Sequence, residues 1–206
     1  MRLLTIFLVF GMMVVSGCSF LDPKPDSSRY FLLRPMAEPG SVPALDELVL
    51  GLGPVTVPDY LDRIEMLEHV GPYEVRYSAR DRWVEPLGTQ IERTLAENLD
   101  ALLQPQALAM YPWYRTAGVG LQVEIAFSPI RPDQEGAWRE RAEWVVREAE
   151  TRRILERQEF EFDIGSDLTP PEGVVTKLSE ELLRLSGEIA AAVRRHLGTS
   201  RQGSYR

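Results

Sequence analysis

The sequence holds almost none of the residues that bind metals or form disulfides. Cys18 is the single cysteine among 206 residues, and the two histidines, His69 and His196, lie far apart in the chain. A lone thiol cannot form an internal disulfide, so a folded domain must depend on its hydrophobic core. We find no group of metal ligands with a characteristic spacing, and we expect neither a metal nor any other cofactor.

The motifs of the common catalytic classes are absent as well. There is no G-x-S-x-G nucleophile elbow and no glycine-rich loop of the kind that cradles phosphate. Without a reactive cysteine or paired histidines, nucleophilic catalysis would need a serine or threonine beside an aspartate or lysine, and no spacing marks one. We therefore predict that the protein is not an enzyme.

The chain has few positive charges and no apolar run long enough for a membrane-spanning helix. It carries 23 Lys and Arg against 31 Asp and Glu, a formal charge of -8, so we expect no nucleic-acid partner. The main apolar run, Leu3–Val15, would span roughly 20 Å as a helix, short of the roughly 30 Å of a bilayer's hydrocarbon core. Because this run follows Arg2, it is typical of a secretion signal.

Residues 15–18, with the sequence VSGC, have the pattern of a bacterial lipobox. We predict that residues 1–17 are a lipoprotein signal peptide and that Cys18 is the lipid-attachment site, acylated with palmitate or related chains. The alternative is an ordinary secretory signal in which Cys18 is incidental. Several acyl chains on one residue anchor a protein stably, whereas one chain binds only marginally. Ser19 stands where an aspartate would indicate inner-membrane retention, which favours the outer membrane and a domain facing the periplasm.

Behind the lipobox the chain divides into three parts. Residues 18–28 are polar, contain Pro23 and Pro25 and lack periodicity, so we predict a lipid-anchored tether that reaches at most roughly 35 Å. We find no repeat, no low-complexity tract and no convincing linker after residue 46, and we predict that residues 29–198 form a single domain with its own core. Residues 199–206 are expected to form a disordered tail.

Two amphipathic helices are predicted by apolar residues at three- and four-residue spacing. The first covers residues 87–102, between Pro86 and Pro105. The second begins at a capping box, Thr169–Glu172, and we expect it to end at Gly198, because glycine is a natural helix stop.

Alternating apolar and polar residues predict strands in the remainder of the domain. Three such segments in the second half predict an antiparallel meander with one solvated face, although Glu140 breaks the alternation of the middle segment. In the first half, Gly51, Gly53 and Pro54 predict an edge or irregular position for their strand. The expected strands are 30–33, 47–57, 73–77, 121–128, 138–147 and 153–164. Together these elements predict an α+β fold, with a mixed or mostly antiparallel sheet of about five to six strands and two main helices.

The segment Leu50–Arg63, LGLGPVTVPDYLDR, resembles the ABC-type transport auxiliary lipoprotein family, which includes paraquat-inducible protein C. Two other features are similar to the family: Tyr30–Leu33 (YFLL) behind a lipobox and short tether, and Tyr77–Leu87 (YSARDRWVEPL) before a helix that contains Asn98-Leu99. The resemblance extends over essentially the whole mature chain. Beyond about residue 105 it depends on the order of the elements alone.

This resemblance implies a non-enzymatic outer-membrane lipoprotein. The partners it implies are a periplasmic protein built of MCE domains and an inner-membrane permease or ABC transporter, in a system that moves lipids between the membranes and preserves envelope integrity. It also implies a ring-shaped homo-oligomer that receives the tip of the MCE protein. The alternatives are a structural lipoprotein of an outer-membrane assembly machine and a periplasmic hydrolase.

Five motif positions are predicted to bind the partner. Tyr60, Leu61 and Arg63 follow a strand end in a proline-marked loop, where a scaffold displays binding groups. Arg82 and Trp83 precede a helix, and Arg and Trp are typical interface anchors. The alternative is structural: Tyr60, Leu61 and Trp83 belong to the core, and an arginine pairs with a nearby carboxylate.

Overall fold

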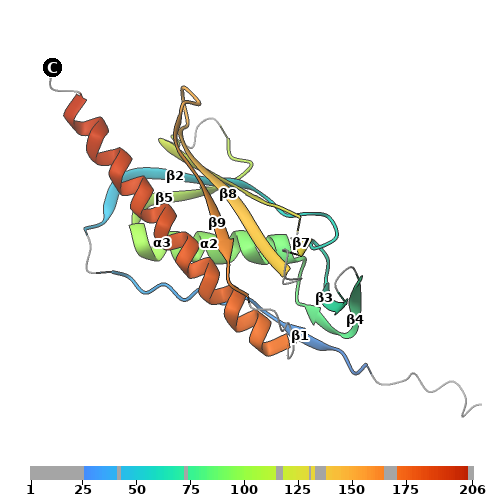
Figure 1. Cartoon of the computed structure of the whole chain (residues 1–206). Coiled ribbons are helices and arrows are strands. Elements are labelled where there is room, and N and C mark those ends of the chain that lie inside the picture. The colour runs from blue at the N-terminus through green and yellow to red at the C-terminus, as the bar shows by residue number, and fades with distance from the viewer. Residues whose placement is uncertain are drawn as a thin grey trace, which may run out of the picture.

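Figure 1 shows the computed structural model of the chain, which describes residues 26–40, 43–71, 74–114, 118–129, 131–132, 138–164 and 171–203. The predicted signal peptide, Cys18 and most of the predicted tether lie outside the described residues. Of the helices in the described part of the chain, none is both long and apolar enough to cross a bilayer.

The larger of two sheets has six strands and forms one wall of the core. Five strands lie in the order β5–β2–β6–β8–β9, and the two-residue β7 pairs with the first residues of β8, continuing the line of β6. The strands are β2 (Leu45–Thr56), β5 (Pro105–Met110), β6 (Leu121–Phe127), β7 (Arg131–Pro132), β8 (Trp138–Glu148) and β9 (Ile154–Phe162).

Strand β2 is the second strand in this order and pairs in parallel with both of its neighbours, β5 and β6. Strands β6, β8 and β9 are antiparallel to one another, as the predicted meander requires. The register of β2 against β6 shifts between Leu52 and Val55, which confirms the irregularity predicted around Pro54. Strand β2 as a whole is not at an edge, because it has a neighbour on each side. Its pairing with β5 ends at Leu52, however, and only the pairing with β6 continues past Pro54, where a shift in register accommodates the missing N–H of proline.

The smaller sheet has three strands in the order β1–β4–β3. They are β1 (Arg29–Phe31), β3 (Glu65–Gly71) and β4 (Glu74–Trp83). Strands β3 and β4 form an antiparallel hairpin, and β1 pairs in parallel with the end of β4. The α+β class is confirmed, but the strands divide between two sheets because β1, β3 and β4 pair only with one another.

Helices α2 (Leu87–Leu103) and α3 (Pro171–Gly203) cover the same face of the larger sheet and pack against each other (Figure 1). Helix α2 ends where Gln104 adopts a left-handed conformation, with φ 44°, and Pro105 begins β5. Helix α3 continues past the predicted stop at Gly198, so residues 199–203 are helical and do not belong to a disordered tail. A single glycine weakens a helix by about 1 kcal/mol but does not by itself end it.

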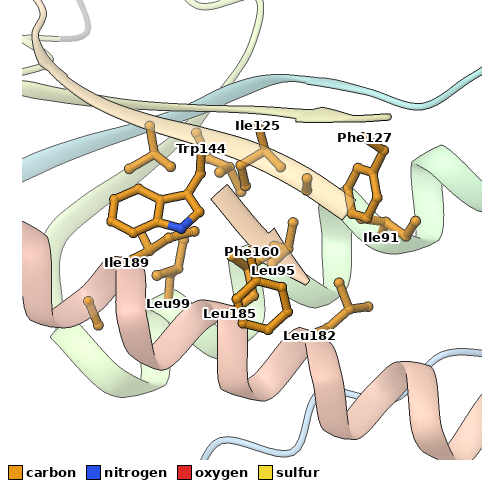
Figure 2. Close-up of a cluster of buried hydrophobic side chains, with 14 of the residues drawn as sticks. Ile91, Leu95, Leu99, Ile125, Phe127, Trp144, Phe160, Leu182, Leu185 and Ile189 are labelled. Carbon is orange, nitrogen blue, oxygen red and sulfur yellow. The ribbon is translucent and has the colours of Figure 1, made fainter. Parts of the chain in front are cut away.

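The core fills the space between the larger sheet and the two helices. Figure 2 shows Trp144 of β8 and Ile125 of β6 directed toward the helices, with Leu99 of α2 and Ile189 of α3 opposite them. Trp144 is 1% exposed, and Leu99 and Ile189 are fully buried. Burial of each such aliphatic side chain stabilises the fold by about 1.5–3 kcal/mol, which gives the domain the core that a chain with one cysteine needs.

Candidate functional site

The loop between β2 and β3 carries the second half of the Leu50–Arg63 motif and contacts the start of α2. After Pro58 the chain turns back, and the backbone N–H groups of Leu61 and Asp62 donate to the Pro58 carbonyl oxygen at 2.8 and 3.0 Å. The Asp62 carboxylate accepts a hydrogen bond from the backbone N–H of Gly88 at 2.9 Å. Gly88 lies in the first turn of α2, so Asp62 satisfies one of the N–H groups that the start of a helix leaves without a partner.

Glycine at position 88 permits this contact. A Cβ added to Gly88 would lie 2.9 Å from Asp62 Oδ1 and 3.3 Å from the carboxyl carbon, so one side would have to move. Pro86, at the N-cap position of α2, forms no side-chain cap. Asp62 therefore supplies the cap from outside the helix and fixes its neighbours Leu61 and Arg63 relative to α2.

Tyr60 and Arg63 contact the β3–β4 hairpin. The Tyr77 hydroxyl donates to the Tyr60 carbonyl oxygen at 3.1 Å, and the Arg63 guanidinium lies over the Tyr77 ring, 4.7 Å from its centroid. Arg63 Nε lies 3.3 Å from the Glu65 carboxylate, although half of the Arg63 side chain remains exposed. Arg82 stands opposite Glu65 in the register of the smaller sheet.

Leu61 and Trp83 meet at a cavity of about 90 Å³ that lies where the two sheets and the two helices converge. The cavity walls come from the β2–β3 loop, the smaller sheet, the starts of α2 and α3, the end of β6 and the start of β8. Figure 2 shows two of the lining residues, Phe127 and Ile91, side by side at one end of the core. Apolar lining residues include Leu61, Met66, Trp83, Ile91, Phe127 and Leu178.

Glu140 is the one ionisable side chain among the described residues that line this cavity. It belongs to the inward-facing row of β8, in line with Ala142 and Trp144, and is 7% exposed. Neither of its carboxyl oxygens has a hydrogen-bond partner within the described residues. Buried polar atoms without a partner are uncommon in folded proteins, so this carboxyl requires an explanation.

Burial in these apolar surroundings raises the pKa of Glu140 from 4.5 to about 8. Desolvation disfavours the charged form, and the electrostatic influence of the nearby Arg141 backbone opposes it only in part. The Arg141 side chain pairs with Glu159 and Glu161 on the solvated face of the sheet. At neutral pH Glu140 is therefore mainly an uncharged acid, which can donate one hydrogen bond and accept others.

The predicted site residues divide between the cavity and the hairpin. Leu61 and Trp83 line the cavity, and Trp83 is 4% exposed, so a binding partner would reach its ring only through that space. Tyr60, Arg63 and Arg82 lie outside the cavity lining, near the β2–β3 loop and the smaller sheet. The arrangement of Leu61, Trp83 and Arg63 also fits the structural alternative, because two of these residues pack into the core and the third pairs with a carboxylate.

Glu140 is the residue of this site that the prediction from sequence missed. Its signal was visible in the chain, because a carboxylate interrupts the otherwise apolar row of its strand. The strand pattern alone could not show that the interruption faces a cavity, since the other walls come from distant segments.

The described residues around the cavity include neither a metal-ligand cluster nor the common nucleophiles. Across the described ranges, no three His, Cys, Asp or Glu side chains gather as a metal site would require. The described lining of the cavity has no serine, threonine, cysteine, histidine or lysine to act as a nucleophile or its base. His196 lies elsewhere, with Nε2 2.9 Å from the Glu156 carboxylate.

A larger, open groove of about 640 Å³ lies at the start of β2 and is partly lined by Arg194. The Arg194 guanidinium donates to the backbone carbonyl oxygens of Pro43 and Leu102, at 2.8 and 2.9 Å. Its charge therefore ties α3 to the start of β2 and the end of α2. The smaller cavity is the stronger candidate for a binding site, because the Glu140 carboxyl that lines it has no hydrogen-bond partner within the described residues.

The family of the chain follows from a match over most of its length. Residues 30–190 match the family described as ABC-type transport auxiliary lipoprotein component. The chain belongs to this family. The match confirms the resemblance seen at Leu50–Arg63 and extends it well beyond residue 105. No curated protein matches the sequence.

Two solved structures share the fold of this auxiliary lipoprotein. A protein from Xanthomonas campestris, assigned to the DUF330 family, has a TM-score of 0.62 and 13% identity, and the match covers 86% of this chain and 100% of that one. A second, described as an uncharacterized protein, has a TM-score of 0.57 and 18% identity, with coverage of 81% and 99%. At these identities the similarity shows the fold alone.

Proposed function

We propose that this auxiliary lipoprotein is a non-enzymatic subunit of an intermembrane lipid-transport system, held to the periplasmic face of the outer membrane by acyl chains on Cys18. The observation that carries the proposal is the family match over residues 30–190, which spans nearly the whole folded domain. The partners we propose are an MCE-domain periplasmic protein and an inner-membrane permease or ABC transporter. The lipobox at residues 15–18 supports the anchor.

The position of the first strand supports a role close to a membrane. Strand β1 begins at Arg29, so residues 18–28 alone would separate the acyl chains from the folded domain, a distance of at most roughly 35 Å. Arg29 Nε lies 2.7 Å from Asp81 Oδ1, which holds β1 against β4. The tether would therefore leave the domain beside the smaller sheet.

The surface we propose for the MCE-domain partner is the β2–β3 loop together with the adjacent part of the smaller sheet. Of the five predicted residues, Arg63 is best placed to contact a partner directly, because it is half exposed and rests on the Tyr77 ring. An arginine supported in this way keeps its outward N–H groups in place for hydrogen bonding. Tyr60 and Arg82 would border the contact, and Leu61 and Trp83 would support it from the cavity side.

Affinity purification of the full-length protein from its own membranes tests this function. Extraction in several mild detergents should recover an MCE-domain protein, and recovery of none would contradict the proposal. Arg63→Glu should lower the recovered partner by about fivefold or more, the loss expected for an interface anchor. Arg157→Glu is a matched control, because Arg157 is also half exposed and paired with a glutamate but lies on β9.

We further propose that copies of the lipoprotein form a ring-shaped homo-oligomer. Native mass spectrometry of the extracted protein should show one closed assembly of fixed subunit number. A monomer at all concentrations would contradict the ring without affecting the proposed partner.

A further inference from the structure

The cavity beside Glu140 has a chemistry that the proposed docking role does not use. We propose that it binds the uncharged, oxygen-bearing end of an aliphatic molecule, an alcohol or an ester. The Glu140 carboxyl donates a hydrogen bond to the ligand's oxygen, and the apolar walls enclose the adjoining carbons. This inference goes beyond the proposed function and does not depend on the lipid anchor.

The described lining of the cavity favours an uncharged ligand, because it offers no basic side chain to pair with an anion. No lysine or arginine is present among its described lining residues, so a bound carboxylate or phosphate would be buried without a counterion, at great cost. An ammonium group would need an ionised Glu140, and burial holds the pKa of this acid at about 8. An alcohol or ester oxygen needs neither, because it accepts the proton that the acid already carries.

The size of the cavity limits how much of the ligand it holds. Its volume of about 90 Å³ corresponds to about three water molecules at roughly 30 Å³ each, whereas pockets for whole drug-sized ligands measure about 300–1,000 Å³. The cavity therefore accommodates the end of a molecule, an oxygen with a few carbons, and not a complete lipid.

The unpartnered carboxyl is the second observation that points to a ligand. Apolar side chains surround Glu140, and one in its place would avoid the cost of a buried polar atom without a hydrogen bond. A ligand oxygen at the carboxyl would remove this cost in the occupied state. Binding thus accounts for a residue that packing alone does not explain.

The methionines of the chain provide a direct probe. Once residues 1–17 are removed, three remain: Met66 lines the cavity, whereas Met36 and Met110 are 44% and 38% exposed. We would label the methionine methyl groups with ¹³C, place the lipid-anchored protein in phosphatidylcholine nanodiscs, and titrate 1-butanol while recording NMR spectra. Met66 should show a saturable shift, and Met36 and Met110 should not. Retention of the signal peptide would add further methionine signals, so failure of the anchor is recognised separately.

Charged analogues of the same length test the selectivity. Butyrate and butylamine should bind at least about tenfold more weakly than 1-butanol, because each introduces a charge that the cavity leaves unpaired or must pair by ionising Glu140. Equal affinity for the three compounds would overturn the proposal. Tighter binding of butylamine would also overturn it, since the cavity would then be a cation site.

Substitutions at Glu140 complete the test. Glu140→Gln keeps a neutral group that donates and accepts, so butanol affinity should remain within about threefold, whereas Glu140→Leu removes the hydrogen bond and should weaken binding about fivefold to tenfold. Glu143→Gln, on the opposite face of the same strand, is the control and should change nothing. Unchanged Met36 and Met110 signals would show that each variant is folded. The absence of a saturable Met66 shift in the unsubstituted protein, or undiminished binding in Glu140→Leu, would refute the proposal.

Discussion

The stability of the domain should fall as the pH rises through the neutral range, because of Glu140. The pKa of this acid is raised by burial from 4.5 to about 8. Between these two values the folded protein keeps a proton that the unfolded chain has released, so the unfolded state is increasingly favoured as the pH rises. Each pH unit in this window costs about 1.4 kcal/mol of unfolding free energy. Between pH 5.5 and 7.5 the loss is therefore roughly 2–3 kcal/mol, or about 5–10 °C in melting temperature.

The comparison with Glu140→Gln isolates this effect. The lowered pKa values of Asp81 and Glu68 arise from pairing with Arg29 and Arg76, and these groups titrate below the window. Glu92, whose pKa burial also raises, is present in both proteins and cancels in the difference. Denaturant unfolding would be followed by tryptophan fluorescence at pH 5.5, 6.5 and 7.5. The difference in unfolding free energy between the two proteins should grow with pH in favour of Glu140→Gln. Parallel profiles would refute the reasoning, because they would mean that Glu140 ionises without penalty in the folded protein.

Three further predictions concern the anchor, the helix cap and the core. Cys18→Ser should leave the protein unprocessed or released from the outer membrane, and fractionation with unchanged electrophoretic mobility would contradict the lipid anchor. Asp62→Ala removes the cap on Gly88 and should lower the unfolding free energy by about 1 kcal/mol, a fall of roughly 2–4 °C in melting temperature. Asp62→Asn keeps an acceptor oxygen and should lower it less. Equal losses in the two variants would argue against capping. Trp144→Ala empties a site that is 1% exposed and should cost about 3–5 kcal/mol in unfolding free energy, and a loss below about 1 kcal/mol would contradict its central position in the core.

The parts of this fold that sequence predicts well are those set by local periodicity. The leucine spacing over residues 87–102 gives α2 nearly to the residue, since a helical face is defined by neighbours three and four positions apart. The meander of β6, β8 and β9 follows from alternation along consecutive segments with short connections. Both patterns are complete within short stretches of the chain, so no knowledge of distant partners is needed.

The features that escaped prediction depend on contacts between distant segments. The parallel pairing of β2 with β5 and β6, and the separate sheet of β1, β3 and β4, require partners that alternation does not identify. The end of α3 was placed at Gly198, although the helix continues to Gly203, because a glycine signal is weaker than a continuing helix. The candidate site is the clearest case. Glu140 lines a cavity only because Leu61 and Trp83, from other parts of the chain, supply further walls.

The smaller sheet connects the N-terminal end of the domain to the cavity. In the register of β1 with β4, Arg29 lies opposite Asp81 and Phe31 lies opposite Trp83, so the ion pair that secures the first strand stands two residues from a wall of the cavity. Leu33, two residues after Phe31, is held by its backbone N–H, which donates to the buried Gln90 side chain of α2 at 2.8 Å. The segment from Arg29 to Leu33 thus ties the start of the domain to both β4 and α2, two of the elements that enclose the site. Trp83 and α2, which both contribute to the walls of the cavity beside Glu140, are therefore both held by the same short stretch of chain.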